Sequence, residues 1–132
     1  MAKSNNVEKH FVKAVWDFDD DTGAVATLAL KQTSNIPQYA LVTDVCLDTT
    51  VVNASAGANT LQVAVGATAI TAAIAIGDRN NVADPPITAL SAPIKVPTAG
   101  GDEIKVIMAG AAATAGRCTI TVGYILSDQG MQ

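Results

Sequence analysis

The segment 117–126 carries the clearest structural signal in the sequence, because apolar side chains recur at every second position. One parity of this segment holds the set Cys118, Ile120, Val122, Tyr124 and Leu126. A period of two places successive side chains on opposite faces of a β-strand, whereas a helix needs apolar residues three and four apart. Segment 39–48 alternates in the same way: Tyr39, Leu41, Val45 and Leu47 on one parity, Ala40, Val42, Asp44, Cys46 and Asp48 on the other. Both segments are therefore predicted to be half-buried strands.

Several further segments are rich in β-branched residues and are bounded by turn residues, which is typical of strands. They are residues 11–18, 24–30, 61–65 and 103–108. The first two are separated by the acidic cluster ending at Gly23, a turn that predicts a β-hairpin. Loops are expected at 53–59, 77–86 and 109–116. Residues 67–76 fit a strand or a helical stripe, since isoleucine and threonine favour strands and alanine favours helices. A strand or a short irregular turn is preferred there.

This count gives about seven or eight strands and no convincing helix of ten or more residues. The pattern predicts an all-β fold, an antiparallel β-sandwich or jelly roll. A length of 132 residues leaves room for one ordinary domain. Residues 1–10 are polar and lack strand signals, so they are expected to form an N-terminal arm, with a single β-sandwich domain at 11–132. The first residues lack the apolar core of a secretory signal, so synthesis in the cytoplasm is expected.

The composition argues against several partners. The chain has eight lysine and arginine residues, which are scattered, and a formal net charge of −4, so no nucleic-acid partner is expected. The most apolar stretch, 64–77, is too short to cross a bilayer, so no membrane partner is expected. Apolar residues make up 49% of the chain, but most of them are small. A core of small residues gains less free energy from burial, so we expect this chain to bury further apolar surface against partner chains.

Residues that could support catalysis or metal binding are few. His10 is the only histidine and falls in the expected arm, and nothing places Cys46 or Cys118 beside it. The strand parities of the two cysteines direct them to different faces, so two free thiols are expected rather than a disulfide. No nucleotide-binding or nucleophile motif is present. We expect no catalytic residue, no cofactor and no metal, and a protein that is not an enzyme.

The acidic cluster between Asp17 and Asp21 is the sharpest local feature. An EF-hand calcium loop needs glycine at its sixth position and glutamate at its twelfth. Counted from Asp17, these positions hold Thr22 and Leu28, so that motif fails. A hydrogen-bonding turn at a solvated tip is the favoured interpretation, and an irregular cation site is the alternative.

Interface candidates follow from the scarcity of large side chains. Three aromatic residues beside the arm, Phe11, Trp16 and Phe18, suit contact anchors, with core packing as the alternative. The apolar segment from Val106 to Gly116 is a second possible contact region. The candidate interface residues are Lys3, Phe11, Trp16, Ile107 and Met108.

Four segments together resemble the head decoration, or cement, proteins of tailed bacteriophages. They are Trp16-Asp17-Phe18 with the turn at Asp19–Gly23, and segments 36–45, 59–66 and 115–124. The resemblance covers roughly residues 15–126 and includes no catalytic motif, so it transfers no site residue. The alanine-rich segment 67–76 departs from it.

The resemblance implies a β-rich structural subunit, commonly a homotrimer, on the exterior of the virion capsid. Its partners would be the major capsid protein and further copies of itself, and it would bridge neighbouring capsomers. Two alternatives stay open. One is a different virion part, such as a head-fibre base or a tail component, and the other is a carbohydrate-binding β-sandwich module.

Overall fold

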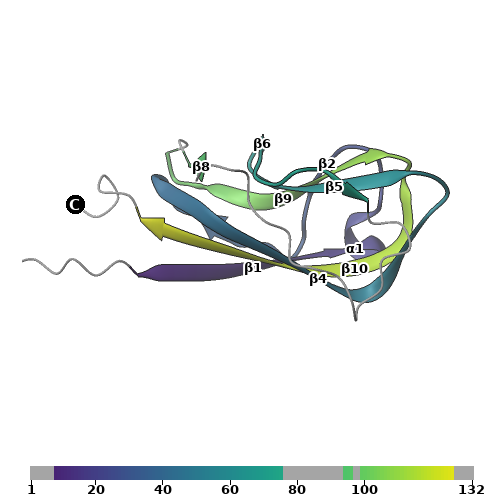
Figure 1. Cartoon of the computed structure of the whole chain (residues 1–132), viewed down its shortest axis with the longest axis horizontal. Coiled ribbons are helices and arrows are strands. Elements are labelled where there is room, and N and C mark those ends of the chain that lie inside the picture. The colour runs from purple at the N-terminus through teal and green to yellow at the C-terminus, as the bar shows by residue number, and fades with distance from the viewer. Residues whose placement is uncertain (1–7, 76–93, 97–98, 127–132) are drawn as a thin grey trace, which may run out of the picture.

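The computed structural model describes residues 8–75, 94–96 and 99–126, which form two packed layers of β-strands (Figure 1). The elements in chain order are β1 (Lys9–Asp17), α1 (Phe18–Asp21), β2 (Thr27–Ala29), β3 (Asn35–Ile36), β4 (Ala40–Ser55), β5 (Asn59–Val65), β6 (Thr68–Ala69), β7 (Ile74–Ala75), β8 (Ile94–Lys95), β9 (Asp102–Gly110) and β10 (Ala113–Leu126). The predicted all-β fold is confirmed. Four of the ten described strands are only two residues long, which raises the number above the seven or eight expected.

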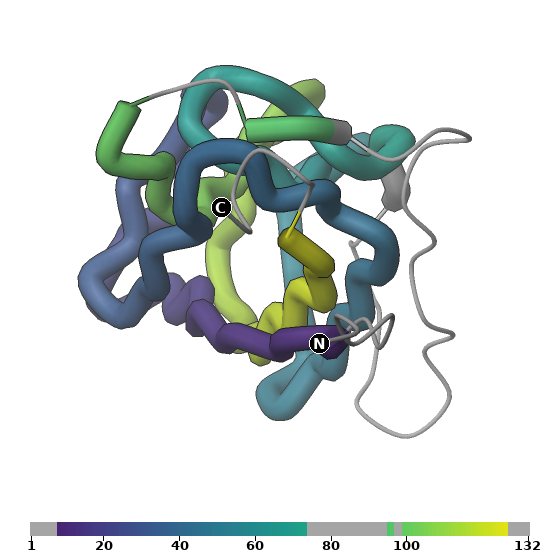
Figure 2. The backbone as a smooth tube through the Cα atoms, turned by 90° about the vertical axis from the view of Figure 1, so that its left-hand side faces the viewer, coloured from purple at the N-terminus to yellow at the C-terminus, as the bar shows by residue number. Residues whose placement is uncertain are grey.

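The first layer is a four-stranded sheet with the strand order β1-β10-β4-β8. The second layer has the order β2-β9-β5-β6, with β3 pairing with β9 and β7 pairing with β5. Every pairing within the described residues is antiparallel. Seen end-on in Figure 2, the backbone of the two layers surrounds the core. The largest side chains in that core are Trp16, Ile36, Leu47, Leu61, Ile70, Ile104, Met108 and Ile120.

Strand β10 follows the predicted alternation, whereas β4 departs from it at one point. Val42 is buried and so is Val45, although the two have opposite parity. The register with β10 shifts here, because Tyr124 pairs with Val42 and Gly123 pairs with Asp44. Thr43 is therefore the extra residue of a β-bulge, which exchanges the faces of the strand. The expectation that Leu41 shares a face with Val45 and Leu47 is wrong for this reason.

The hairpin predicted between residues 11–18 and 24–30 is also wrong. Strand β1 pairs with β10 and β2 pairs with β9, so the two segments belong to different sheets. Between them the chain forms the short helix α1, because the side chain of Asp17 caps it by accepting the Asp19 N–H at 3.0 Å. The Trp16 indole N–H then donates to the Thr22 carbonyl at 2.8 Å. These contacts turn the chain from one layer towards the other.

Other boundaries shift by a few residues. Strand β1 begins at Lys9, so Lys9 and His10 belong to the sheet rather than to an arm, and residues 1–7 lie outside the described residues. Strand β4 continues to Ser55, and β9 and β10 extend into the loop expected at 109–116. They meet in a tight turn where Gly110 has a φ of 79°. The preference for a strand or irregular turn at 67–76 is confirmed up to residue 75, while residues 76–86 lie outside the described residues.

Candidate contact surfaces

One side of the four-stranded sheet carries polar and charged side chains in register across three strands. The rows run from β1 through β10 to β4. They are Phe11–Gly123–Asp44, Lys13–Thr121–Cys46 and Val15–Thr119–Asp48, and together with Lys9 we call these residues the open face. Paired residues of antiparallel strands project to the same side of a sheet, so the rows form one continuous surface. The other side of the same three strands supplies buried residues such as Ala14, Leu47 and Ile120.

Phe11 is the prominent apolar residue of the open face, with 60% of its surface exposed. Its ring lies across Gly123, where an added Cβ would stand 2.9 Å from Phe11 Cε1 and 3.2 Å from Asp44 Oδ2. Lys9 forms an ion pair with Asp44 and so spans the intervening strand. The hydrogen bond from Lys9 lowers the pKa of Asp44 below its ordinary value; partial burial opposes this shift and a hydrogen bond from Thr43 adds to it.

The predicted interface residues fall into different environments. Trp16 and Met108 are 0% and 1% exposed, so their assignment to an interface is wrong and the core-packing alternative holds for Trp16. Ile107 is half-buried and pairs with Thr27 and Gln62 inside the second sheet. Phe11 is exposed, and Lys3 lies outside the described residues. Position along β1 separates the two aromatic residues, since Phe11 projects to the open face and Trp16 to the core.

The acidic cluster uses its carboxylates to hold the backbone. Asp21 is 8% exposed, and its two oxygens accept the backbone N–H groups of Lys31 at 2.9 Å and Asp17 at 3.1 Å. Together with the cap formed by Asp17, these bonds fix α1 against the end of β1. The cluster is thus a hydrogen-bonded helical turn. Within the described residues, no group of three or more His, Cys, Asp or Glu side chains is placed to hold a metal ion.

The cysteines lie on opposite faces, as their strand parities predict. Cys46 is exposed on the open face and Cys118 is buried, and both thiols are free. Asn53 is buried too, and its side-chain N–H donates to Cys118 Sγ at 3.4 Å. Cys118 therefore sits in a small polar site within the core. No helix in the described part of the chain is long and apolar enough to span a membrane.

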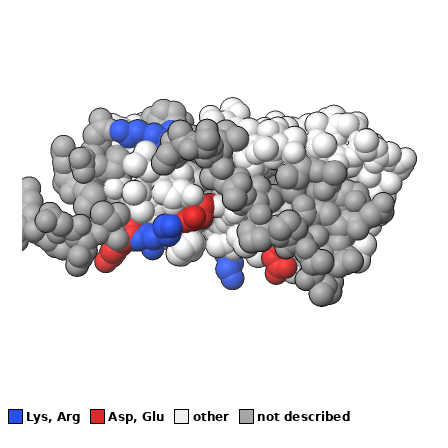
Figure 3. Space-filling model, viewed as in Figure 1, with Lys and Arg blue, Asp and Glu red and all other residues white. Residues whose placement is uncertain are grey.

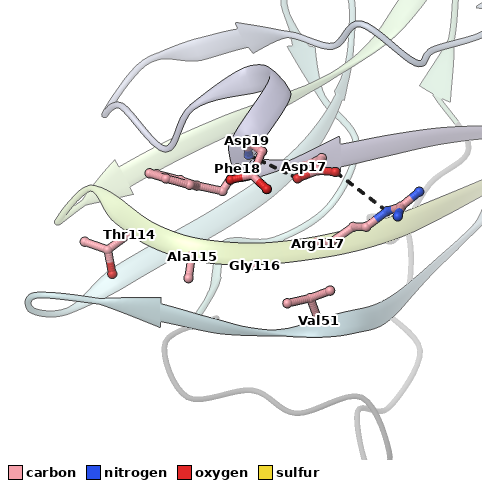
Figure 4. Close-up of a pocket in the computed structure, with 8 residues that line it drawn as sticks. All are labelled: Asp17, Phe18, Asp19, Val51, Thr114, Ala115, Gly116 and Arg117. Carbon is pink, nitrogen blue, oxygen red and sulfur yellow. Dashed lines mark hydrogen bonds and ion pairs between the residues drawn. The ribbon is translucent and has the colours of Figure 1, made fainter.

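A hollow of about 340 Å³ lies at the end of the sandwich beside α1 (Figure 4). Its lining residues are Asp17, Phe18, Asp19, Val51, Thr114, Ala115, Gly116 and Arg117. Asp17 Oδ2 and Arg117 Nε are 3.9 Å apart, so the positive charge of Arg117 is paired with a carboxylate of the same chain. Val51, by contrast, is 51% exposed beside this ion pair. The hollow thus combines an ion pair formed within the chain with an exposed apolar side chain.

The same end of the sandwich carries an exposed surface of small uncharged residues, which we call the uncharged tip. It consists of segments 24–26, 56–58 and 110–112. Backbone hydrogen bonds hold these segments in place: Ala111 N–H donates to the Ala58 carbonyl at 2.6 Å, and Met108 N–H, in β9 just before segment 110–112, donates to the Ala26 carbonyl at 2.8 Å. Val25 is its largest side chain and is 53% exposed. In Figure 3 the described atoms at the right-hand end are white, without charged groups. Sequence reasoning identified only the 110–112 part, as a piece of a longer apolar loop.

Comparison with known proteins shows a similarity of fold. No protein-family model matches the sequence, and no curated protein matches it. Among solved structures, a chain of the "Cyanophage Pam1 capsid asymmetric unit" superimposes with a TM-score of 0.61. The alignment covers 96% of this chain and 91% of that chain, and 18% of the aligned residues are identical. The protein therefore has the fold of a chain found in a cyanophage capsid asymmetric unit, over almost its whole length.

Proposed function

We propose that this protein is a non-enzymatic structural protein of a phage virion. It binds the outside of the capsid through the major capsid protein and stabilises the shell by bridging neighbouring capsomers. The observation that supports this most strongly is the shared fold with a chain of a phage capsid structure, over 96% of the sequence. The sequence resemblance to head decoration proteins supports the more specific role on the outside of the capsid.

The uncharged tip is the surface that fits this role best. Small side chains allow another backbone to approach closely, and contact there does not require charged groups to lose their hydration. Val25 is the one larger residue, and its burial against a partner would add roughly 1.5–3 kcal/mol at most. A protein that acts by attachment alone needs such a surface on a rigid domain, and the backbone hydrogen bonds between the tip segments provide that rigidity.

The decisive experiment is binding of the purified protein to capsids that lack it. We expect saturable binding at a fixed ratio to the major capsid protein, and capsids that withstand higher temperature or lower ionic strength. Val25→Asp places a charge at the centre of the tip and should reduce binding at least tenfold. Ala72→Asp is the matched control, because it adds the same charge at an exposed alanine outside the tip. Absence of binding by the unmodified protein would refute the proposal.

A different virion part, such as a head-fibre base or a tail component, is compatible with the same similarity of fold. Electron cryomicroscopy of the virion distinguishes these roles by position. A decoration protein occupies repeated sites over the capsid surface, whereas a fibre base or tail component is confined to a vertex or to the tail. We also propose that the copies associate as homotrimers, which light scattering tests by mass.

A further inference from the structure

Within the part of the chain that the structure describes, no strand pairs with the outer edge of β1, and the backbone groups on that edge can be assigned. Val15 N–H donates to the Gln32 carbonyl at 2.8 Å, and the Lys13 carbonyl accepts from Ser34 Oγ at 2.6 Å. Both contacts point away from β10, so the odd-numbered residues of β1 direct their N–H and C=O groups to the outer edge. Lys9 and Phe11 belong to this set, and their backbone groups have no partner among the described residues.

Among the described residues, strand β4 has an unpaired edge on the other side of the same sheet, beyond Val42. Strand β8 pairs only with Leu41 and Val42, and no other described strand pairs with the outer side of β4 beyond that point. The register with β10 places the hydrogen-bonding groups of Asp44, Cys46 and Asp48 towards β10. The alternation of the strand then directs those of Val45 and Leu47 to the outer edge.

The direction of the two edge strands permits one kind of junction between copies. Both β1 and β4 run antiparallel to β10, so they run parallel to each other. A second copy rotated about an axis along the strands would therefore bring its β1 beside β4 in a parallel pair. In a parallel pair, a residue whose backbone N–H and C=O groups point towards the neighbouring strand lies beside a residue whose backbone groups point away from the first strand. Phe11 could then lie beside Asp44, Cys46 or Asp48 of the partner subunit, and we place it beside Cys46, with both side chains on the open face, because of the charges considered next.

The charges of the two edges match in this register. Lys9 falls beside Asp44 of the partner subunit, and Lys13 falls beside Asp48 of the partner subunit. Lys13 and Asp48 have no ion-pair partner among the described residues of their own chain. The competing arrangement, two β1 strands paired antiparallel about Phe11, would set Lys9 against Lys13. Like charges directly opposite each other destabilise a sheet, so the β1–β4 junction is favoured.

We propose that copies of this chain join head to tail, with the β1 edge of one copy pairing in parallel with the β4 edge of the next. Such a contact uses two different surfaces of each copy and closes into a ring when the rotation between copies is a simple fraction of a turn. The inference goes beyond attachment to a capsid, because it concerns the chain alone and assigns the residues of the contact. The Lys13 carbonyl already accepts from Ser34 Oγ and Val15 N–H donates to Gln32, so the available edge ends at the Lys13 N–H and the junction is confined to Lys9–Lys13.

A cross-link tests the register directly. Phe11→Cys places a thiol beside Cys46 of the partner subunit. Within one chain the two positions lie on strands separated by β10, at least about 9.5 Å apart. A disulfide spans at most about 7 Å between Cα atoms, so only a link between copies can form. Mild oxidation should give covalent species larger than a dimer on non-reducing gels, and Cys46→Ser in the same background should abolish them. Dimers that persist without Cys46, or no cross-linking, would overturn the proposal.

Charge reversal gives a second test that does not depend on oxidation. Lys13→Glu and Asp48→Lys should each shift the mass measured by light scattering towards the monomer, while melting curves report an intact fold. The double variant restores opposite charges at the junction and should recover the mass of the unmodified protein. If each single variant keeps the full mass, or if the unmodified protein is a monomer at every concentration, the proposal fails. Edge lysines would then serve only to prevent strand pairing. Capsid binding is measured separately, so failure of either proposal leaves the other open to its own test.

Discussion

Lys9 and Asp44 form an ion pair over Gly123, and so connect two strands that do not hydrogen-bond to each other. The span is possible because Gly123 has no side chain to stand between them. Phe11 lies across the same glycine and covers one side of the pair. A single small residue in β10 thus permits a contact between β1 and β4 on the open face.

The ion pair predicts a small dependence of stability on pH. The pKa of Asp44 is lower in the folded chain than the ordinary value of an aspartate, which it takes in the unfolded chain. A lowered carboxyl pKa contributes stability at pH values above the unfolded pKa, and this contribution disappears as the pH falls through the folded pKa. Asp44→Asn should therefore lower the free energy of unfolding by about 0.2–1 kcal/mol at neutral pH, since the pair is exposed. The difference from the unmodified protein should vanish in strong acid.

Denaturant melts across this pH range provide the measurement, with Glu103→Gln as the control. Glu103 is exposed and has no ion-pair partner among the described residues, so its replacement should produce no comparable difference at neutral pH. A deficit of the Asp44→Asn variant that persisted undiminished in strong acid would contradict the electrostatic explanation.

Gly123→Ala should reveal the contact with Phe11. The added methyl would stand 2.9 Å from Phe11 Cε1, so the exposed ring must move and the covering of the ion pair is lost. We expect a loss of up to about 1 kcal/mol of stability in the unmodified chain. In a Phe11→Ala background the same change should be neutral or stabilising, because alanine is entropically favoured over glycine within a strand. A double-mutant cycle measures this coupling directly. Equal effects in both backgrounds would rule out the contact.

Gly116 should tolerate substitution much less well than Gly100. Gly116 has a φ of 138°, and an added Cβ would overlap Asn53 Oδ1 and stand 3.0 Å from Trp16 Cζ3. Neither neighbour has room to move, since both are buried. Gly116→Ala should therefore destabilise the fold by about 3 kcal/mol or more. Gly100 also has a positive φ, of 85°, but a Cβ added there would meet nothing within 4 Å. Gly100→Ala isolates the backbone strain and should cost about 1–2 kcal/mol. Equal losses would show that packing against Asn53 and Trp16 contributes nothing.

The sequence predicts β10 well and β4 less well, and the difference has a physical cause. The core residues of β10 from Cys118 to Val122 keep one parity, so local alternation alone identifies its buried face. In β4, Thr43 is an extra residue, and so is Thr50, opposite the shift between Arg117 and Cys118. These bulges arise from pairing with a strand far away in the sequence, which no local pattern encodes.

The acidic cluster between Asp17 and Asp21 also fits the start of a helix, whereas the predicted hairpin treated it as a turn. Asp17 followed by three more aspartates is typical of a capped helix start, because carboxylates there accept backbone N–H groups and interact favourably with the positive end of the helix dipole. The same residue types also occur in turns, so composition alone did not separate the two. Among the contact surfaces, sequence reasoning found Phe11. It identified only the 110–112 part of the uncharged tip, because that surface forms when three distant segments come together.

Asp21 provides the last prediction, because its carboxylate binds two backbone N–H groups, those of Lys31 and Asp17. Asparagine has one acceptor oxygen, so Asp21→Asn must leave one donor without its partner and bring an NH2 group against it. An unsatisfied buried group costs about 1–3 kcal/mol. Asp20→Asn removes the same charge at an exposed position of α1 and should change the stability by less than about 0.5 kcal/mol. Thermal melts with and without calcium chloride complete the experiment. If the cluster serves the backbone alone, calcium should leave all three melting temperatures unchanged. A calcium-dependent rise that Asp21→Asn abolishes would instead establish the irregular cation site.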